Sequence, residues 1–344
     1  MVYLRHENRI KREGKPLIEL ENVVRSFKIV KRKSGFRGTL KNLFAPETEI
    51  KRAVNNLSFT IPDGQMVGFI GPNGAGKSTT VKMLSGVLYP DSGSLRVNGF
   101  VPHRDRKKYV RHIGVVFGQR SQLWQDLPIT DSFEMLKSIY KIPDEIYRTN
   151  IELFNEILSL HTFENKQVRQ LSLGQRMRAD IAAAFLHNPD IIFLDEPTIG
   201  LDVVVKENVR AFIKSINEQR GCTVIFTTHD MQDIEKVCKR ILIIDEGALL
   251  YDGTTEKLRD VFGEERVLTV SLNEKTDTLT ACGIKSSVDA ENPLDHIFRV
   301  PKQIKLPEMI TEISAKAEIA DLRIKEPEIE AIIRRIYEKG AADA

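Results

Sequence analysis

The stretch GPNGAGKST, Gly71–Thr79, decides the fold of the chain. It satisfies the pattern Gly-x-x-x-x-Gly-Lys-Ser/Thr, whose glycines let the backbone turn tightly and approach a ligand closely. The apolar run Met66–Ile70 precedes it, and the helix-favouring segment TTVKMLSGVL overlaps its end and continues the chain. Because strand, loop and helix follow in the required order, a chance match in a glycine-rich turn is the remote alternative.

This loop predicts a phosphate site. Its successive N–H groups and the positive end of the following helix dipole would face the β- and γ-phosphates of a nucleotide. Lys77 adds a full charge, and the Ser78 hydroxyl can ligate Mg²⁺. The predicted nucleotide-binding residues are Gly71, Pro72, Asn73, Gly74, Ala75, Gly76, Lys77, Ser78 and Thr79.

Outward from the loop, short apolar runs alternate with helical segments. The runs are Met66–Ile70, Ile113–Phe117, Ile191–Leu194, Val224–Thr227 and Ile241–Ile244. Near-continuous Val/Ile/Phe runs of this length are typical of parallel strands covered on both faces, so we expect an α/β fold. Between about Pro128 and Gln170 the apolar residues keep helical spacing, which predicts a helical insertion.

Further polar groups follow the apolar runs. Asp195 and Glu196 end IIFLDEP, where ligands of open α/β sheets collect. Asp195 is the expected Mg²⁺ partner, and Glu196 can orient a water and act as general base. His229, after TVIFTT, can donate to the γ-phosphate, and Gln119, after IGVVF, can reach Mg²⁺ and the attacking water. The alternatives are a solvated loop or helix cap for the acidic pair and core packing for His229.

A second small turn, LSLGQ at Leu171–Gln175, begins a strongly helical segment. Met177, Ile181 and Phe185 give that segment an apolar face. A helix start is an anion site in its own right, and the alternative is a serine N-cap with no further role.

Size and composition limit the remaining possibilities. The chain has 344 residues, 41% of them hydrophobic and 29% charged, and a net charge of +3, too small to indicate nucleic acid. No run approaches the ~20 apolar residues of a membrane span, and the N-terminus lacks the apolar core of a signal peptide. Cys222, Cys238 and Cys282 are widely spaced, which favours reduced thiols and a cytoplasmic setting.

Taken together, these motifs resemble the ATPase subunits of ABC transporters over roughly residues 17–262. The order is GPNGAGKST, Gln119, LSLGQ, LDEP, the turn TIGLD (Thr198–Asp202) and His229. The resemblance implies a P-loop NTPase with a RecA-like core, an antiparallel β subdomain and a helical subdomain at about 120–180. It also implies a dimer that binds two ATP at its interface.

The resemblance also assigns site residues. Glu196 looks like the catalytic base and His229 like the switch histidine, while Gln119 looks like the residue that couples the Mg²⁺ site to the helical subdomain. The Mg²⁺ ligands would be Ser78, Gln119 and Asp195, and Phe27 is the best match for the aromatic that stacks on adenine. Ser172, Gly174, Gln175 and Asp202 would serve the nucleotide of the partner subunit. One departure is Leu173, where the family has glycine.

Two segments stand apart from the ATPase domain, residues 1–262. The basic insertion 28–52 contains GTLKNLF and resembles a membrane-facing helix of some polysaccharide exporters, with a solvated loop as the alternative. Residues 263–344 predict a small α+β domain, and ADLRIKEPEIEAIIRRIY within them resembles a C-terminal element of drug, antibiotic and polysaccharide exporters.

The sequence therefore predicts an ATPase subunit that powers separate permease chains from the cytoplasmic face of the membrane, as an exporter and a homodimer, without nucleic acid. A non-transport ABC ATPase of translation or DNA repair is the rival. Only one ATPase cassette is present, and the interval from Lys77 to Ser172 is too short for a long coiled coil. A further alternative is that the tail dimerises or binds a ligand independently. The cargo is not encoded here.

Overall fold

The computed structural model describes residues 16–30, 48–118, 121–263, 265–325 and 329–342. The chain divides between Asp252 and Gly253 into two compact units. The sequence had assigned this boundary to residues 262–263. The difference is helix α10 (Thr255–Phe262), which packs against α12 (Ile329–Ala342) in the second unit.

The first unit is built on a six-stranded sheet in the order β5-β6-β7-β3-β8-β9. Neighbouring strands from β5 to β8 are parallel. The bounds are β3 Met66–Ile70, β5 Ile113–Phe117, β6 Ile191–Asp195, β7 Thr223–Thr228, β8 Arg240–Asp245 and β9 Ala248–Thr254. All five apolar runs picked from the sequence are strands here, because a parallel sheet covered on both faces needs apolar residues on both.

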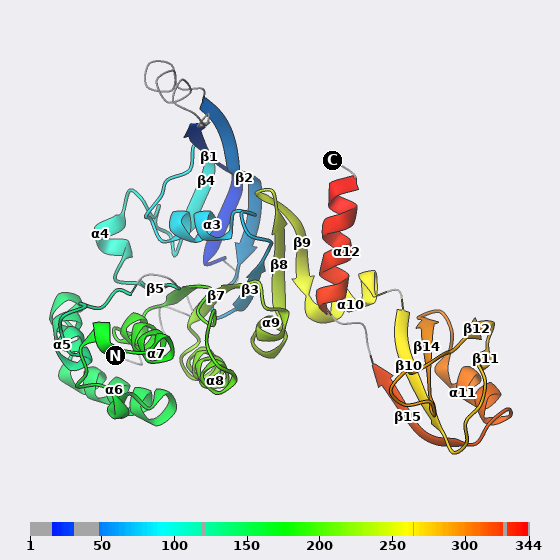
Figure 1. Ribbon diagram of the computed structural model, residues 1–344. Helices are drawn as coiled ribbons and strands as arrows, with labels where there is room; N and C mark the ends of the chain where they lie inside the picture. The colour runs from blue at the N-terminus through cyan, green and yellow to red at the C-terminus, as the bar shows by residue number, and fades with distance from the viewer. Residues whose placement is uncertain (1–15, 31–47, 119–120, 264, 326–328, 343–344) are drawn as a thin grey trace, which may run out of the picture. The chain divides into compact units, whose positions relative to one another are not determined.

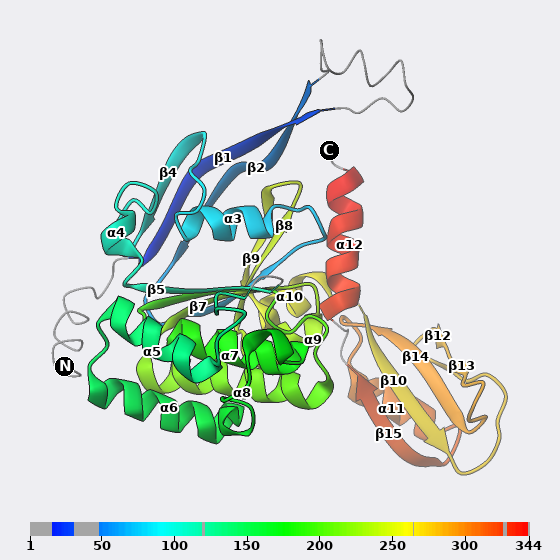
Figure 2. The same cartoon turned by 60° about the vertical axis from the view of Figure 1, so that its left-hand side comes forward.

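Helices cover both faces of this sheet. Figure 2 shows α3 on one side and α7 to α9 on the other. The bounds are α3 Lys77–Leu84, α4 Arg106–Tyr109, α7 Leu173–Phe185, α8 Val203–Arg220 and α9 Met231–Val237. Met177, Ile181 and Phe185 of α7 are buried, as the spacing of four predicts. The sheet-and-helix layers are those of the expected P-loop fold.

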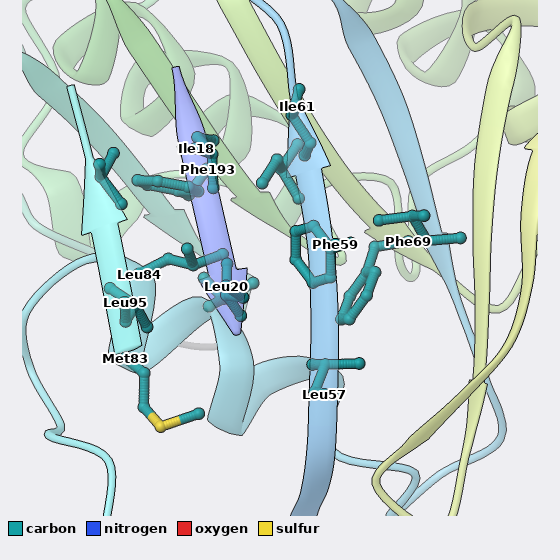
Figure 3. Packing of buried hydrophobic residues seen from close by; sticks show 14 of the residues in the cluster. Ile18, Leu20, Leu57, Phe59, Ile61, Phe69, Met83, Leu84, Leu95 and Phe193 are labelled. Atoms are coloured by element: carbon teal, nitrogen blue, oxygen red, sulfur yellow. The ribbon is translucent and has the colours of Figure 1, made fainter. Parts of the chain in front are cut away.

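A three-stranded antiparallel sheet, in the order β2-β1-β4, completes the core above α3. Its strands are β1 Ile18–Val30, β2 Thr48–Ile61 and β4 Ser92–Val97. Figure 3 shows Leu20, Phe59 and Leu95 of this sheet packed with Leu84 of α3 and Phe69 of β3. Full burial of each such side chain stabilises the fold by roughly 1.5–3 kcal/mol, so this cluster fixes the loop between β3 and α3.

The helical insertion comprises α5 (Ile129–Tyr140), α6 (Asp144–Leu158) and two short 3₁₀ turns, Leu160–Thr162 and Val168–Gln170. Pro128 and Pro143 immediately precede the two helices, where a missing N–H costs nothing. Lys141 and Ser159 end them with positive φ. The sequence prediction of helices in this region agrees with the structure.

The segment that separates β1 from β2 is shorter than the predicted insertion 28–52, because both ends of that range belong to the strands. β1 continues to Val30 and β2 begins at Thr48, and Lys28 pairs with Ile50 in register. The alternating pattern was hidden there by basic residues on exposed strand positions. The segment GTLKNLF lies outside the described residues.

The second unit is a four-stranded antiparallel sheet, β13-β14-β10-β15, with α11 against it (Figure 1). The bounds are β10 Glu265–Leu272, β13 Ser287–Val288, β14 Asp295–Pro301, α11 Leu306–Ser314 and β15 Ile319–Lys325, with a small hairpin of β11 Thr280–Ala281 and β12 Ile284–Lys285. The sequence missed β11 to β13, whose two-residue strands carry no periodicity. Among the described residues, every helix is too short or too polar to cross a bilayer.

Candidate active site

The loop Gly71–Gly76 connects β3 to α3 with backbone angles that favour glycine. Gly74 has φ +88° and Gly76 has φ +105°. A Cβ at Gly76 would collide with the carbonyl oxygen of Ala53 in β2. The loop therefore contacts the antiparallel sheet at Gly76, whereas the space beside Gly74 is open.

Lys77 lies folded into this loop. Its Nζ donates to the carbonyl oxygens of Gly71, at 2.6 Å, and Pro72, at 3.1 Å, and the residue is only 5% exposed. Burial lowers the pKa of the ammonium group, while Glu196 and Asp195 oppose this shift. A desolvated cation bonded to two carbonyl dipoles still lacks a full counter-charge, and an anion in the loop would supply it.

Asp195 ends β6 beside the start of α3. Its Oδ1 accepts from Ser78 Oγ at 3.1 Å and from Thr227 Oγ1 of β7 at 2.7 Å. Hydroxyl and carboxylate oxygens are the ligands that Mg²⁺ prefers, and a phosphate and waters usually complete its shell. The pair Ser78 and Asp195 thus fits the expected metal site.

Glu196 follows Asp195 with φ +53°, a sparsely populated conformation for a residue with a Cβ. Its N–H donates to the carbonyl oxygen of Thr227 at 3.0 Å, which holds the turn. His229 Nδ1 lies 3.4 Å from Glu196 Oε1, and the two side chains are 54% and 23% exposed. The strained turn thus places the Glu196 carboxylate beside the more exposed His229 ring.

β5 ends against the same turn. Gly118 N–H donates to the Asp195 carbonyl oxygen at 2.9 Å, and a Cβ at Gly118 would lie 2.8 Å from the Glu196 carbonyl oxygen. Gln119, the next residue, lies outside the described residues. The position of its neighbour is compatible with the role that the sequence assigned to it.

The turn LSLGQ is a complete capping box. Ser172 Oγ accepts from the Gln175 N–H at 3.2 Å, and Gln175 Oε1 accepts from the Ser172 N–H at 3.1 Å. Leu173 is 39% exposed, and its Cδ2 would lie 2.9 Å from a Cβ added at Gly200. The residue that replaces the family glycine therefore packs on the turn Thr198–Asp202.

Asp202 is likewise a helix cap within its own chain. It is the N-cap of α8, and its Oδ1 accepts from the Val205 N–H at 2.9 Å. A Cβ at Gly174 would lie 3.4 Å from Val205 Cγ2. The starts of α7 and α8 thus lie together, with Ser172 and Asp202 exposed.

Phe27 lies on β1 opposite Lys51, near the Ala53 carbonyl that borders Gly76. The guanidinium of Arg25 stacks over its ring at 5.0 Å and over Tyr89 at 4.8 Å, and it pairs with Asp91 at 2.6 Å. One aromatic surface of Phe27 is therefore already in contact with a cation. The ring is half-buried and stays the candidate for base stacking.

Sequence reasoning missed two buried polar clusters near the site. Thr198 Oγ1 donates to Asp233 Oδ2, and Arg210 Nε donates to Asp233 Oδ1 at 2.7 Å, with Asp233 fully buried. Asp180 Oδ1 of α7 accepts from Ser121 Oγ at 2.8 Å and from the Gln122 N–H at 3.1 Å. Nothing in the local sequence separates these acids from exposed ones.

Comparison with known proteins agrees with this geometry. The ABC transporter family matches residues 54–199. The ABC transporter ATP-binding protein NatA of Bacillus subtilis is 31% identical over 62% of this chain and 87% of its own. The linearmycin resistance ATP-binding protein LnrL of Bacillus subtilis is 28% identical over 85% of this chain and 96% of its own.

Solved structures show the same fold. The ATP-binding cassette MJ0796, a dimer bound to ADP and phosphate after hydrolysis, is 27% identical with a TM-score of 0.57 and aligns over 69% of this chain and 98% of its own. The fold and the site define a P-loop ATPase. The chain belongs to the family of ABC transporter ATP-binding proteins and is an ATPase that energises transport.

Proposed function

We propose that Gly71–Thr79 holds the triphosphate of ATP and that Glu196 is the general base. The observation that carries this is the convergence of β6 and β7, which brings Glu196 and His229 to 3.4 Å from each other beside the phosphate loop. Glu196 is partly exposed and so can accept a proton from the attacking water. His229 would orient that carboxylate and the γ-phosphate.

Ser78, Asp195 and Gln119 would hold Mg²⁺. When bound, the ion neutralises charge on the β- and γ-phosphates and so lowers the barrier to attack. Thr227 keeps the Asp195 carboxylate turned toward Ser78. Lys77, which the loop carbonyls now hold, would exchange those bonds for phosphate oxygens.

A second copy of the chain would complete each site. Ser172, Gly174, Gln175 and Asp202 lie on the exposed starts of α7 and α8 rather than in the loop that they would serve. The dimeric state of the related cassette MJ0796 supports an arrangement in which these residues face the nucleotide of the partner. Phe27 would stack on the adenine of the nucleotide that the phosphate loop of its own chain holds.

The permease would dock on the helical insertion. A cavity of about 200 Å³ opens between α5 and α6, lined by Ile129, Phe133, Tyr147, Ile151 and Asn155 among others. Asn155 Oδ1 is buried without a hydrogen-bond partner there. An apolar side chain with a nearby donor, presented by a permease on the cytoplasmic face of the membrane, would fill it.

Export is the direction we propose. Its support is the resistance function in the name of LnrL and the description of YbhF of Escherichia coli, 33% identical over 60% of this chain, as a probable multidrug transporter protein. These relatives favour transport over translation or DNA repair.

Glu196→Gln tests the assignment. The variant should bind MgATP as the native chain does, lose at least ~100-fold in turnover, and accumulate an ATP-bound dimer in size-exclusion chromatography. Adding Ser172→Arg should abolish that dimer, because a large cation would fill the position meant for the partner's phosphate.

Glu246→Gln is the matched control. Glu246 also follows a strand of the same sheet, β8, with positive φ, but it is exposed and makes no contact with His229 among the described interactions. Its turnover should be unchanged. Native turnover in Glu196→Gln would reject Glu196 as the base.

A further inference from the structure

The outer strand of the second unit leaves one backbone edge open. β15 pairs with β10 on one side, and no described strand pairs with it on the other. Residues 320–325 are all exposed. An exposed strand edge with apolar residues is a template for pairing with another strand.

One hydrogen bond indicates which backbone groups of β15 point toward the open edge. The Leu322 N–H donates to the Asp321 Oδ1 of its own strand at 2.8 Å instead of to β10. It therefore points away from β10, and the Ile324 N–H, two residues on, points the same way. Leu322 presents its N–H and C=O to whatever joins the edge.

The apolar layer of the sheet also continues to this edge without cover. Leu322 lies opposite Val270 and Ile324 opposite Leu268, so both share the face that packs against α11. Val270 and Leu268 are fully buried, whereas Leu322 is 37% and Ile324 51% exposed. Ile319, at the start of β15, packs against the cluster that includes α11, but Leu322 and Ile324 further along the strand stay partly uncovered.

We propose that β15 pairs antiparallel with β15 of a second copy of this chain, about a two-fold axis at Leu322. In this register the two Leu322 residues lie opposite each other on the apolar face and exchange backbone hydrogen bonds, and the contact lies on the regular part of β15, beyond the irregularity at Ala320. On the other face, Asp321 of each copy lies opposite Arg323 of the other. The strand is thus complementary to itself in charge as well as in shape.

The present contacts of these charges allow that exchange. Arg323 is 3.7 Å from Asp321 in its own chain and 2.6 Å from Asp295. Asp295 is 6% exposed, whereas the Arg323 side chain is 60% exposed, so Arg323 can keep its bond to Asp295 and still meet a carboxylate from solvent. Two opposite-charge pairs and one apolar pair directly across a two-stranded contact each stabilise it modestly.

This contact is separate from the ATP-bound dimer proposed above, since it uses neither the phosphate loop nor the start of α7. It is therefore tested without nucleotide, on the full chain carrying Lys77→Ala. Sedimentation velocity should show self-association over a series up to about 200 µM, a range suited to a small interface.

Charge variants make the test specific. Asp321→Arg and Arg323→Asp should each weaken self-association by about tenfold or more, because like charges then face each other twice. An equimolar mixture of the two variants should restore it, since every cross-strand pair is again of opposite charge. Val288→Lys, on the opposite edge strand β13, is the matched control and should associate like the parent.

A cross-link tests the register. Directly opposed, hydrogen-bonded residues have Cα atoms about 5.5 Å apart, which suits a disulfide. In a Cys282→Ser background, Leu322→Cys should form a dimer under mild oxidation, and Val288→Cys should not. A monomeric parent chain at every concentration, unaffected charge variants, or equal cross-linking at both edges would overturn the proposal.

Discussion

Asp180 shows how burial sets the chemistry of a single residue. It lies in the middle of α7 and is 5% exposed, with Ser121 Oγ and the Gln122 N–H as its donors. Burial raises the pKa of its carboxyl to about 6, and these two hydrogen bonds only partly oppose the shift. This carboxyl joins the helix that begins with LSLGQ to the segment that follows Gln119.

This shift predicts a pH-dependent stability. Because the pKa of this carboxyl in the folded state lies above its ordinary value of 3.8, the folded chain binds the proton more tightly than the unfolded chain does. Stability therefore falls as pH rises between about 4 and 6, and the loss is complete above about pH 6. Asp180→Asn should recover roughly 1–3 kcal/mol of unfolding free energy at pH 7.5.

Urea denaturation at pH 7.5 and pH 4 measures this effect. The gain from Asp180→Asn should shrink toward zero at the lower pH, where the native carboxyl is itself protonated. Asp131→Asn, at an exposed position of α5, should change stability little at either pH. A gain that is the same at both values would contradict the assignment.

The local conformations of several candidate site residues were predictable from the sequence. Gly74 and Gly76 have positive φ, which favours glycine, and Lys77 follows that glycine-rich loop. Asp195 ends a buried strand, which appears in the sequence as an apolar run. Each of these conformations therefore restricts the residue types nearby in the sequence. Asp233 and Asp180 leave none. Their burial depends on partners between 23 and 59 residues away along the chain.

At the scale of elements, a buried polar cluster joins three segments around the site. Thr198 belongs to the turn before α8, Arg210 to α8, and Asp233 to α9, which begins just after His229. Arg210 and Asp233 are 6% and 0% exposed. The cluster therefore links the turn that contacts Leu173 to the helix that positions the histidine.

Removing one partner should be costly here. Asp233→Ala should lower the unfolding free energy by up to about 3–5 kcal/mol, because it removes the buried carboxylate that pairs with Arg210 and leaves only the half-exposed Glu207 at 2.9 Å. Thr198→Val should cost about 1–3 kcal/mol. The double variant should cost at least ~1 kcal/mol less than the sum of the two.

A double-mutant cycle by urea denaturation measures this coupling. The surface pair Arg169 and Asp126, 2.9 Å apart and mostly exposed, is the control and should couple by less than ~1 kcal/mol. Additive effects of Thr198→Val and Asp233→Ala would mean that the two side chains do not act as a unit.

The sequence predicted helices and strands correctly where apolar residues recur at a regular spacing over the whole element. The five core strands and the helices α5, α6 and α7 were predictable because burial on one or both faces imposes a regular apolar pattern. The hairpin continuation at Lys28–Val30 was not. Its register comes from pairing with Thr48–Ile50 across the sheet, and pairing leaves no pattern in exposed basic residues.

For the whole molecule, function depends on surfaces that meet other chains. The cavity between α5 and α6 has Ile151 in its wall, while Ile139 of α5 is 59% exposed and does not line it. Comparing substitutions at Ile151 and Ile139 therefore distinguishes docking of a permease in the cavity from a general effect of exposed apolar residues.

Ile151→Asp should therefore uncouple the ATPase from its membrane partner. The variant should keep basal ATP hydrolysis but lose at least tenfold in the amount that binds to membranes containing the proposed permease, because a hydrated carboxylate then replaces the apolar wall that a permease side chain would contact. Ile139→Asp should bind normally. Pelleting of both variants with inverted membrane vesicles decides between these outcomes, and equal binding would exclude the cavity.

The sequence by itself determined the P-loop class, the phosphate loop and which five apolar segments form core strands, because tight turns and buried strands restrict residue types locally. Tertiary structure alone decided that Leu173 lies on Gly200, that Asp180 and Asp233 are buried, that α10 belongs with α12, and that β15 has an open edge. These features depend on contacts between segments distant along the chain. Such contacts determine where a residue lies in the structure, but they impose no regular pattern on the neighbouring sequence.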